Sequence, residues 1–528
     1  MNDAIGSPKT RNDQHPNRST ITRSAGEPSI AIIGAGFGGL GMAIQLMKQG
    51  HRRFTIFEAS DGIGGTWREN TYPGAACDVP SHLYCFSFAQ KRDWTRKFAT
   101  QPEILGYING VADRFQVRPK VRFSTKVTAL RWNDDTCDWT VHTDRDEQFQ
   151  FDVVVSAVGQ LHRPNIPDIA GKETFDGPQF HSARWNHGVS LAGKDVVVIG
   201  CGASAIQFIP PVAEQARSVT IMQRSANYIA PRNDVEYSPR QLAAYRYIPG
   251  LAKARRFRIW SSFESKFVIL RKNGRIGKWF MRKYDEGMEP MRKAGLSDEA
   301  LVPDYPPGCK RLLISDNWFP TLVRPNVSVV TDPIERIEPD AIVAGGASHR
   351  ADVLIWGTGF RANEFLAPMS VTGANGADLN DRWASGAEAY AGVCVSGFPN
   401  FFMLYGPNTN LGHNSIVFMI EQQVEYILRI LRRMKAERAA AVDVSSGAMS
   451  AFNQSLQKRL DQTVWSTDCD SWYKTSAGKI TNNWSGLTSS YRAMLRRSDL
   501  SEFRFFSPSS DPHRRKPVSE PAETVVTS

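Results

Sequence analysis

A short apolar run that ends in a glycine-rich turn and is followed by a helical pattern occurs twice in this chain. In the first copy, residues 29–33 lead into Gly34, and the helical pattern extends from 40 to 48. In the second copy, residues 195–199 lead into Gly200. Because buried parallel strands are continuous apolar runs, each copy predicts a strand, a tight turn and a helix.

Further apolar runs extend both units. The additional predicted elements are a second strand in each unit (54–57 and 219–223), two similar buried strands (152–159 and 352–359), the antiparallel stretches before them (126–151 and 327–350) and a long amphipathic helix (416–431). Together they favour an α/β fold with two Rossmann-like dinucleotide-binding domains and a helical insertion.

The order of these elements predicts interleaved domains. The expected division is an N-terminal arm at 1–27, an FAD-binding domain at 28–160 and 385–507, an NADP-binding domain at 161–234 and 301–384, a basic helical insertion at 235–300 and a tail at 508–528. The arm and the tail are expected to be disordered, because they are polar and lack apolar periodicity.

The first turn carries the dinucleotide fingerprint at Gly34, Gly36 and Gly39, and Glu58 ends the next strand 24 residues after Gly34. Such glycines permit a tight turn and the close approach of the backbone to a pyrophosphate. An acid at the end of the second strand accepts hydrogen bonds from ribose hydroxyls. The first unit therefore suits FAD or NAD.

The second turn carries Gly200 and Gly202, with alanine in the third place, and Arg224 stands where the acid would be. A guanidinium binds a 2′-phosphate that a carboxylate would repel, so the second unit suits NADP.

The net charge of +11 is concentrated in one segment. Residues 246–283 hold twelve Lys or Arg and one acid, Glu264. Apolar residues recur there at helical spacing and predict an amphipathic helix with a basic face: Phe257, Trp260, Phe263, Phe267 and Leu270. Such a helix either packs on its own domain or makes weak contact with an anionic membrane; no motif for specific nucleic-acid binding accompanies it.

Seven scattered cysteines without a CxxC pair argue against a disulfide framework, a metal site and a redox dithiol. No signal peptide or long apolar run is found, so a cytoplasmic location is expected.

Residues 175–186 lie between the two units and are rich in glycine, proline and polar side chains, which predicts a connection rather than a core element. They resemble the fingerprint FxGxxxHxxxW(P/D) of Baeyer–Villiger monooxygenases through Phe175, Gly177, His181 and Trp185, although Asn186 departs from its last position. Other segments share the resemblance: Gly64 to Trp67, Tyr72 to Gly74, Cys77, Asp78 and Gly308 to Arg311.

The resemblance implies an FAD- and NADPH-dependent enzyme that inserts one oxygen atom of O2 next to a ketone carbonyl, through a flavin C4a-peroxide, to give an ester or lactone. It assigns Arg311 as the cation that stabilises the anionic reacting groups, Asp78 as the partner that orients it, and His181 to coupling domain movement to turnover. Charge that develops in a dry site needs a fixed cation, and arginine stays protonated.

The resemblance also assigns binding residues. Those expected at FAD are Gly34, Gly36, Gly39, Glu58, Gly65, Thr66, Trp67, Asp78 and Tyr84; those at NADP are Gly200, Gly202, Ser204, Arg224, Ser225 and Lys310; those at the ketone are Leu411, Gly412 and His413, with Trp472 and Trp484.

Two other functions fit paired nucleotide domains. A flavin-containing monooxygenase would oxygenate sulfur or nitrogen, with less need of Arg311. An NADPH-dependent flavoprotein reductase would need the dithiol that the sequence lacks.

Overall fold

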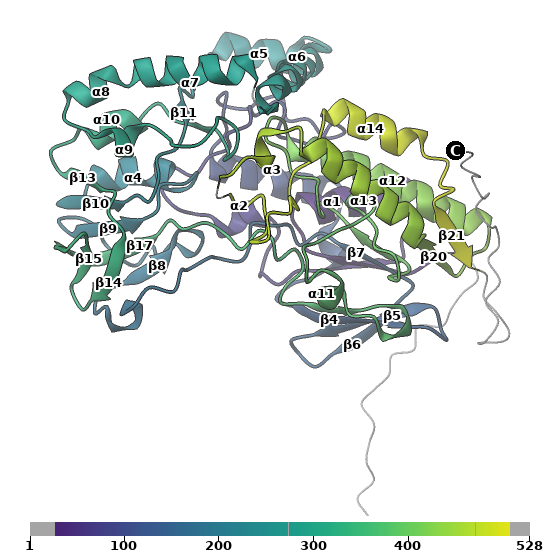
Figure 1. Ribbon diagram of the computed structural model, residues 1–528. Helices are drawn as coiled ribbons and strands as arrows, with labels where there is room; N and C mark the ends of the chain where they lie inside the picture. Colours follow the sequence, from purple (N-terminus) through teal and green to yellow (C-terminus); the bar gives the residue numbers. More distant parts are fainter. Residues whose placement is uncertain (1–26, 273, 470, 507–528) are drawn as a thin grey trace, which may run out of the picture.

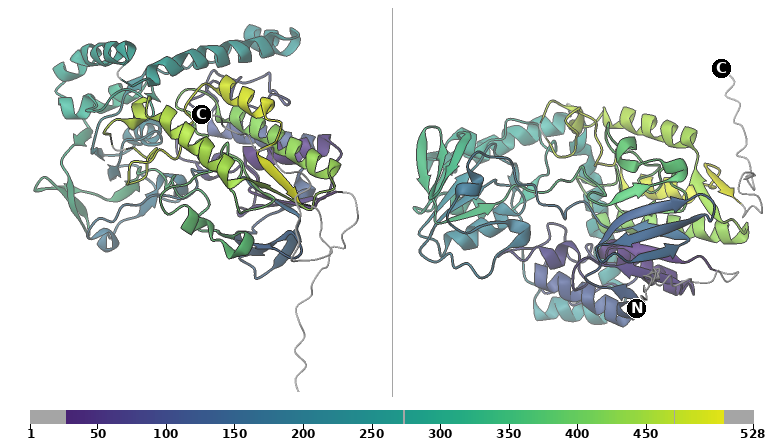
Figure 2. Two further views of the ribbon diagram at one scale, coloured as in Figure 1. Left: turned by 45° about the vertical axis from the view of Figure 1, so that its right-hand side comes forward. Right: turned by 90° about the horizontal axis from the view of Figure 1, so that it is seen from below.

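The computed structural model describes residues 27–272, 274–469 and 471–506. Two sheet-containing lobes lie side by side, and the insertion helices run along one side of the molecule (Figures 1 and 2). The predicted arm, apart from residue 27, and the predicted tail lie outside the described residues.

The first lobe is built on a parallel five-stranded sheet with the order β19-β7-β1-β2-β3. Its inner strands are almost wholly apolar and buried, as the sequence predicts, and helices α1 and α12 pack against one another beside it. The elements are β1 (Ile30–Ile33), α1 (Phe37–Lys48), β2 (Phe54–Phe57), α2 (Thr66–Glu69), α3 (Gln101–Arg114), β3 (Val121–Arg122), β7 (Val153–Ser156), β19 (Phe401–Met403) and α12 (Ile416–Ala436).

The second lobe is built on a parallel sheet with the order β13-β10-β9-β17-β8. Its elements are β8 (Gln179–His181), β9 (Asp195–Ile199), α4 (Ala205–Ala213), β10 (Ser218–Met222), α10 (Trp318–Leu322), β13 (Val327–Val330) and β17 (Val353–Trp356). Strand β8 corrects the prediction that residues 175–186 are only a connection, because Gln179 to His181 pair with Leu354 to Trp356 at the sheet edge.

The two glycine turns have the same backbone geometry. Gly34 has φ of +102° and Gly200 has φ of +100°. A Cβ on Gly34 would lie 2.7 Å from the carbonyl oxygen of Ala157, and one on Gly200 would lie 2.6 Å from that of Gly357. Each glycine turn therefore passes too close to the residues that follow the neighbouring strand, β7 or β17, for any side chain to fit. Residues 152–159 and 352–359 thus occupy equivalent places in the two lobes, which explains why their sequences resemble one another.

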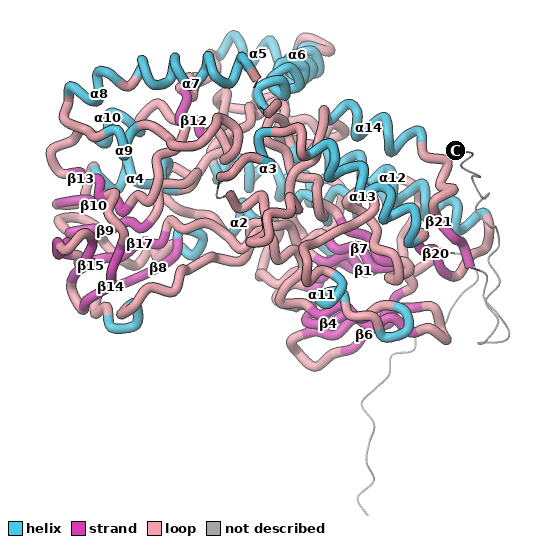
Figure 3. The backbone as a smooth tube through the Cα atoms, viewed as in Figure 1, coloured by secondary structure: helices cyan, strands magenta, loops and turns pink. Residues whose placement is uncertain are grey.

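Smaller sheets lie beside the parallel sheets (Figure 3). In one, β4 (Val127–Asn133), β5 (Asp138–Thr143) and β6 (Gln148–Phe151) pair antiparallel, and β18 (Ser370–Thr372) adds parallel to β4. In another, β14 (Ile334–Glu338), β15 (Ala341–Ala344) and β16 (Ala347–Arg350) are antiparallel. β11 (Ile229–Ala230) pairs parallel with β12 (Leu313–Ile314), and β20 (Ala441–Val444) pairs antiparallel with β21 (Phe503–Phe506). Because β18 pairs with β4, we propose that the chain returns to the first domain before residue 370 rather than at 385.

The basic insertion and the returning segment supply the remaining helices. They are α5 (Pro239–Tyr247), α6 (Leu251–Ser265), α7 (Arg275–Gly287), α8 (Glu289–Lys293), α9 (Asp298–Leu301), α11 (Leu379–Arg382), α13 (Ser446–Leu460) and α14 (Thr488–Arg497). The predicted amphipathic face is wrong in part. Helix α6 ends at Ser265, and Phe257 is 65% exposed while Leu270 is buried.

Glu264 holds this insertion to the returning segment. One carboxylate oxygen accepts hydrogen bonds from the Thr488 backbone N–H (3.1 Å), its hydroxyl (2.8 Å) and Asn414 Nδ2 (2.9 Å), and the other accepts two from Ser489. Burial alone would raise the pKa of Glu264, but hydrogen bonds from His413, Thr488 and Ser489 outweigh it and lower the pKa to about 2. The only acid of the basic segment therefore anchors α6 to the start of α14.

Two further observations concern the cysteines and membranes. Cys309 and Cys469 form a disulfide with a Cα–Cα distance of 6.7 Å, which corrects the expectation that the cysteines are unpaired. The two cysteines are 160 residues apart, so local cysteine spacing could not predict the pair. No helix in the described part of the chain is long and apolar enough to cross a membrane.

Candidate active site

Two turns of the first lobe approach each other where the fingerprint predicts FAD. Gly65 has φ of +53°, and a Cβ there would lie 3.1 Å from the Cα of Gly36, so the Gly65 position favours glycine. Glu58, which is 7% exposed, accepts hydrogen bonds from the backbone N–H groups of Ala35 (2.6 Å) and Ser60 (2.9 Å). Burial raises its pKa, and these bonds oppose the rise. Glu58 thus stays fixed at the strand end, with further lone pairs for hydroxyl groups.

Aromatic side chains continue this site. Thr66 begins α2, and Trp67 donates a hydrogen bond from Nε1 to the hydroxyl of Tyr84 (3.1 Å). The two rings meet edge to face, with centroids 5.6 Å apart. The pair joins the turn at Gly65 to the segment that carries Asp78.

Helices α1 and α4 begin at the two fingerprints and have the features that a dinucleotide pyrophosphate needs. Neither helix has a side-chain cap or an acid in its first turn, so the positive end of each helix dipole is not compensated locally. Ser204 occupies the cap position of α4, and a Cβ on Gly202 would meet no described atom within 4 Å. The residues present therefore fit FAD at the first turn and NADP at the second.

The structure brings the predicted 2′-phosphate residues together from distant parts of the sequence. Arg224 is exposed directly after β10, and its neighbour Ser225 accepts a hydrogen bond from Lys310 Nζ (3.0 Å). The Lys310 ammonium also lies over the ring of Tyr305, 4.4 Å from its centroid. A guanidinium and an ammonium therefore lie on one edge of the second lobe, as a 2′-phosphate site requires.

Arg311 and Asp78 form an ion pair between the lobes. Nε and Nη2 of Arg311 both lie 2.7 Å from Oδ2 of Asp78. The two side chains are 31% and 30% exposed. The charge of Asp78, more than any other group, raises the pKa of Arg311, so this guanidinium is a permanent cation.

The loop before Asp78 is held against the second lobe. A Cβ on Gly74 would lie 2.4 Å from the carbonyl oxygen of Gln207 in α4. The Gln207 side chain accepts hydrogen bonds from Tyr72 (3.1 Å) and from the Ala76 backbone (3.2 Å). Gln207, which sequence reasoning missed, thereby fixes where Asp78 meets Arg311.

Two tyrosines near Arg311 were also missed, because they lie almost 100 residues or more further along the chain. Tyr405 donates a hydrogen bond to Asn410 (2.7 Å), and the buried hydroxyl of Tyr473 has no hydrogen-bond partner among the described residues. Burial raises the pKa of Tyr473 to about 12, while the charge of Arg311 opposes the rise. Burial also raises the pKa of Tyr405, so both phenols are protonated at pH 7 and interact electrostatically with Arg311.

His181 is buried at the end of β8, the edge strand of the second sheet. Its Nδ1 accepts a hydrogen bond from the Ala183 backbone (3.1 Å), and its ring lies 5.7 Å from that of Phe360. Burial lowers its pKa, so the ring is neutral at pH 7. The fingerprint requires glycine at position 177 because a Cβ there would lie 2.5 Å from the carbonyl oxygen of Asp352.

The residues predicted to contact the ketone are packed into the protein. Leu411 is buried, and Gly412 has Trp465 and Leu270 within contact distance of a Cβ. His413 lies 3.5 Å from Glu264, and Trp484 donates a hydrogen bond to the Leu487 carbonyl (3.1 Å). Trp472 is partly buried and packs against Tyr473, with ring centroids 4.5 Å apart, and Tyr473 interacts electrostatically with Arg311.

Comparison with known proteins agrees with this geometry. A model of the family described as flavin-binding monooxygenase-like matches residues 27–366. The chain belongs to this family. It is 39% identical to a Baeyer–Villiger monooxygenase of Streptomyces coelicolor over 482 residues, covering 91% of this chain and 93% of the relative. It is also 39% identical over 477 residues to one from Pseudomonas aeruginosa, covering 90% of each chain.

Solved structures of monooxygenases are also similar to this chain. Cyclohexanone monooxygenase from Rhodococcus sp. Phi1 bound to NADP+ has a TM-score of 0.80 and 29% identity, with 92% of this chain and all (100%) of that chain covered. An oxidized steroid monooxygenase bound to NADP has a TM-score of 0.79 and 29% identity, covering 91% and 100% of the two chains. The predicted fold of two Rossmann-like domains is confirmed.

Arg224→Ala is expected to raise the KM for NADPH by about 10- to 100-fold, which corresponds to the loss of roughly 1.5 to 3 kcal/mol from a charge-assisted contact. The KM for NADH should change little, because NADH has no 2′-phosphate. Steady-state kinetics with both cofactors measure this, with Arg324→Ala, an exposed arginine of the same lobe, as the control. Equal effects on both cofactors would contradict the role of Arg224.

Proposed function

We infer that this protein is an FAD- and NADPH-dependent Baeyer–Villiger monooxygenase, which inserts one oxygen atom of O2 next to the carbonyl of a small ketone. The relatives named above support this function, and the Arg311–Asp78 pair between the two lobes is the observation in this chain that carries it. FAD, once reduced by NADPH, supplies the means of activating O2 when it is bound.

Each lobe has a separate task in this proposal. Gly34, Gly36, Gly39, Glu58 and the Gly65 turn hold FAD, with Thr66, Trp67 and Tyr84 at its reactive end. Gly200, Gly202 and Ser204 hold the NADP pyrophosphate, while Arg224, Ser225 and Lys310 hold its 2′-phosphate. These assignments rest on the open helix ends and on the Lys310–Ser225 contact.

Arg311 stabilises the negative charge that develops on the ketone oxygen during oxygen insertion. Asp78 positions the guanidinium through two contacts to one carboxylate oxygen, which leaves Nη1 free of this pair and able to donate to a reacting oxygen. A fixed donor of this kind needs no reorganisation as charge develops. His181 positions β8 and the following turn and stays outside the bond chemistry.

We also propose that α7 makes weak contact with an anionic membrane surface. Ile276, Trp279 and Met281 are exposed on this helix, beside the exposed Lys278 and Arg282. Interleaved aromatic and basic side chains of this kind suit the headgroup region of a bilayer. Arg256, by contrast, is buried and takes no part in such contact. A cytoplasmic location stays a prediction from the sequence.

Arg311→Ala should lower the rate of ketone oxygenation by at least about 100-fold, since a preorganised charge-stabilising donor is lost. Reduction of the bound flavin by NADPH should stay within about twofold, because the 2′-phosphate residues are unchanged. Anaerobic stopped-flow reduction and product analysis separate the two steps. Arg311→Lys is the matched control, which keeps the charge and loses the two-point contact with Asp78; retained ketone turnover in Arg311→Ala would refute the assignment.

Replacing both Ile276 and Trp279 by serine should weaken binding to phosphatidylglycerol vesicles by about tenfold, because their apolar area would no longer be buried in the lipid. Co-sedimentation of the cofactor-loaded enzyme measures binding. Val323→Ser, an exposed apolar residue of the second lobe, is the control. Equal sedimentation of wild type and double variant would exclude α7 as the contact.

A further inference from the structure

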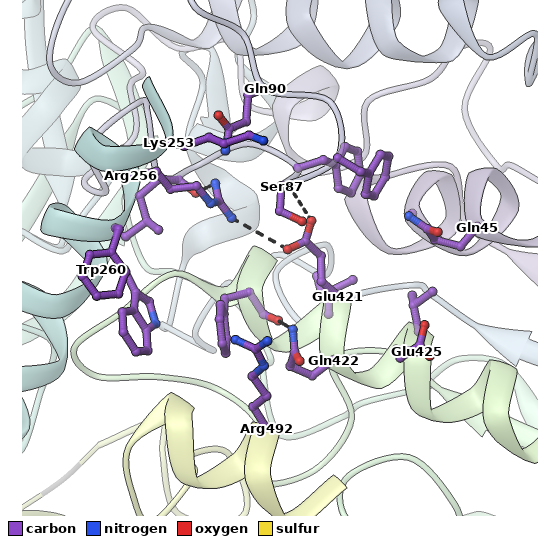
Figure 4. A pocket seen from close by; sticks show the side chains of 18 of the residues that line it. Gln45, Ser87, Gln90, Lys253, Arg256, Trp260, Glu421, Gln422, Glu425 and Arg492 are labelled. Atoms are coloured by element: carbon purple, nitrogen blue, oxygen red, sulfur yellow. Dashed lines mark hydrogen bonds and ion pairs between the residues drawn. The ribbon is translucent and has the colours of Figure 1, made fainter. Parts of the chain in front are cut away.

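A cavity of about 620 Å³ opens between the basic insertion and the returning helices (Figure 4). Neither Arg311 nor Asp78 lines it. Its walls come from α1, the segment 83–90, α6, α12 and α14. None of its lining residues is among those assigned above to FAD, NADP or the ketone. The cavity is therefore a separate site.

The acidic residues of the cavity are already paired. Glu421 lies 3.7 Å from Nη2 of Arg256 and accepts a hydrogen bond from the Ser87 backbone N–H (2.6 Å). Glu425 pairs with Arg432 at 2.9 Å. Figure 4 marks the ion pair between Arg256 and Glu421 by a dashed line. Arg256 also donates hydrogen bonds to two main-chain carbonyl oxygens at 2.8 Å. Its guanidinium is therefore already bound within the protein and is not counted among the cations available to a ligand.

Three other cations remain available to a ligand. Lys253 on α6 and Arg492 and Arg496 on α14 are exposed lining residues, and no described carboxylate lies within ion-pairing distance of them. Arg492 points from α14 towards the cavity (Figure 4). Burial and then the like charge of Arg496 lower the pKa of Arg492. An anion between the two arginines would relieve this repulsion.

Another part of the lining is aromatic, with Phe257 and Trp260 on α6 and Phe418 on α12. Trp260 stacks on Phe418 with ring centroids 5.9 Å apart and contacts Phe257 at 5.8 Å. Phe257 is 65% exposed, which is unusual for a large apolar side chain. The wall thus presents flat apolar surface within the same cavity as the unpaired cations.

We propose that this cavity binds an anionic amphiphile, with its carboxylate or phosphate group at Arg492 and Arg496 and its hydrocarbon body along Phe257, Trp260 and Phe418. The guanidinium groups supply the charge-assisted hydrogen bonds, and the aromatic wall removes the hydrocarbon from water. Gln45 also lines the cavity, and it belongs to α1, the helix that begins at the FAD fingerprint.

Isothermal titration calorimetry of the cofactor-loaded enzyme with decanoate, below its critical micelle concentration, tests this site. One saturable site is expected, and Arg492→Glu together with Arg496→Glu should weaken decanoate binding at least tenfold. The control Arg497→Glu, an exposed neighbour on α14 that does not line the cavity, should bind within twofold of wild type. Phe257→Ala should also weaken binding several-fold. Flavin content and ketone turnover report whether each variant is folded.

Three outcomes would overturn the proposal: decanoate binding that the double variant leaves unchanged, equal affinity for the neutral 1-decanol, or displacement of decanoate by a ketone substrate. Inorganic phosphate that binds as tightly as decanoate would overturn the role of the aromatic wall. A competition experiment with vesicles identifies the source of the ligand. Phosphatidylglycerol vesicles that displace decanoate indicate a membrane lipid, whereas vesicles without effect indicate a free amphiphile, and both results support the site.

Discussion

The ion pair between Arg311 and Asp78 joins the two lobes of this enzyme, and the proposed mechanism places oxygen insertion beside it. Asp78 comes from the FAD-type lobe and Arg311 from a segment that precedes β12 of the other lobe, yet they lie 2.7 Å apart. Lys310 and Arg311 are neighbours in the chain and face different partners, Ser225 and Asp78. In the proposed mechanism, this one dipeptide links the nicotinamide cofactor site to the oxygenation site.

Much of the surrounding structure serves to hold this dipeptide. The disulfide from Cys309 reaches the returning segment at Cys469, and Trp465 donates a hydrogen bond to the Gly308 carbonyl (2.9 Å). Glu264 binds the insertion to the start of α14, where it replaces a local helix cap. The insertion and the returning chain are therefore structural supports of the active site, although neither carries the nucleotide fingerprints.

The sequence was sufficient for those features that depend on local pattern. Strand β2 and strand β9 have the predicted bounds, and both turns adopt the left-handed glycine conformation that the fingerprint requires. Features that depend on contacts between distant segments were not predictable from local pattern. Gln207, Tyr405 and Tyr473 have no motif, and their proximity to the Asp78 loop or to Arg311 arises only when the lobes pack together. The edge strand β8 was missed because its pairing with β17 outweighs the weak strand propensity of a glycine- and proline-rich stretch.

Oxygen transfer to a ketone under ¹⁸O2 tests the central claim most directly. The FAD-loaded enzyme, supplied with NADPH and a panel of ketones, is predicted to form an ester or lactone that carries one ¹⁸O atom at the inserted position, detected by mass spectrometry. NADPH consumption that yields only hydrogen peroxide across the panel, together with labelled oxygen on an added sulfide or amine, would contradict the account and assign heteroatom oxygenation instead.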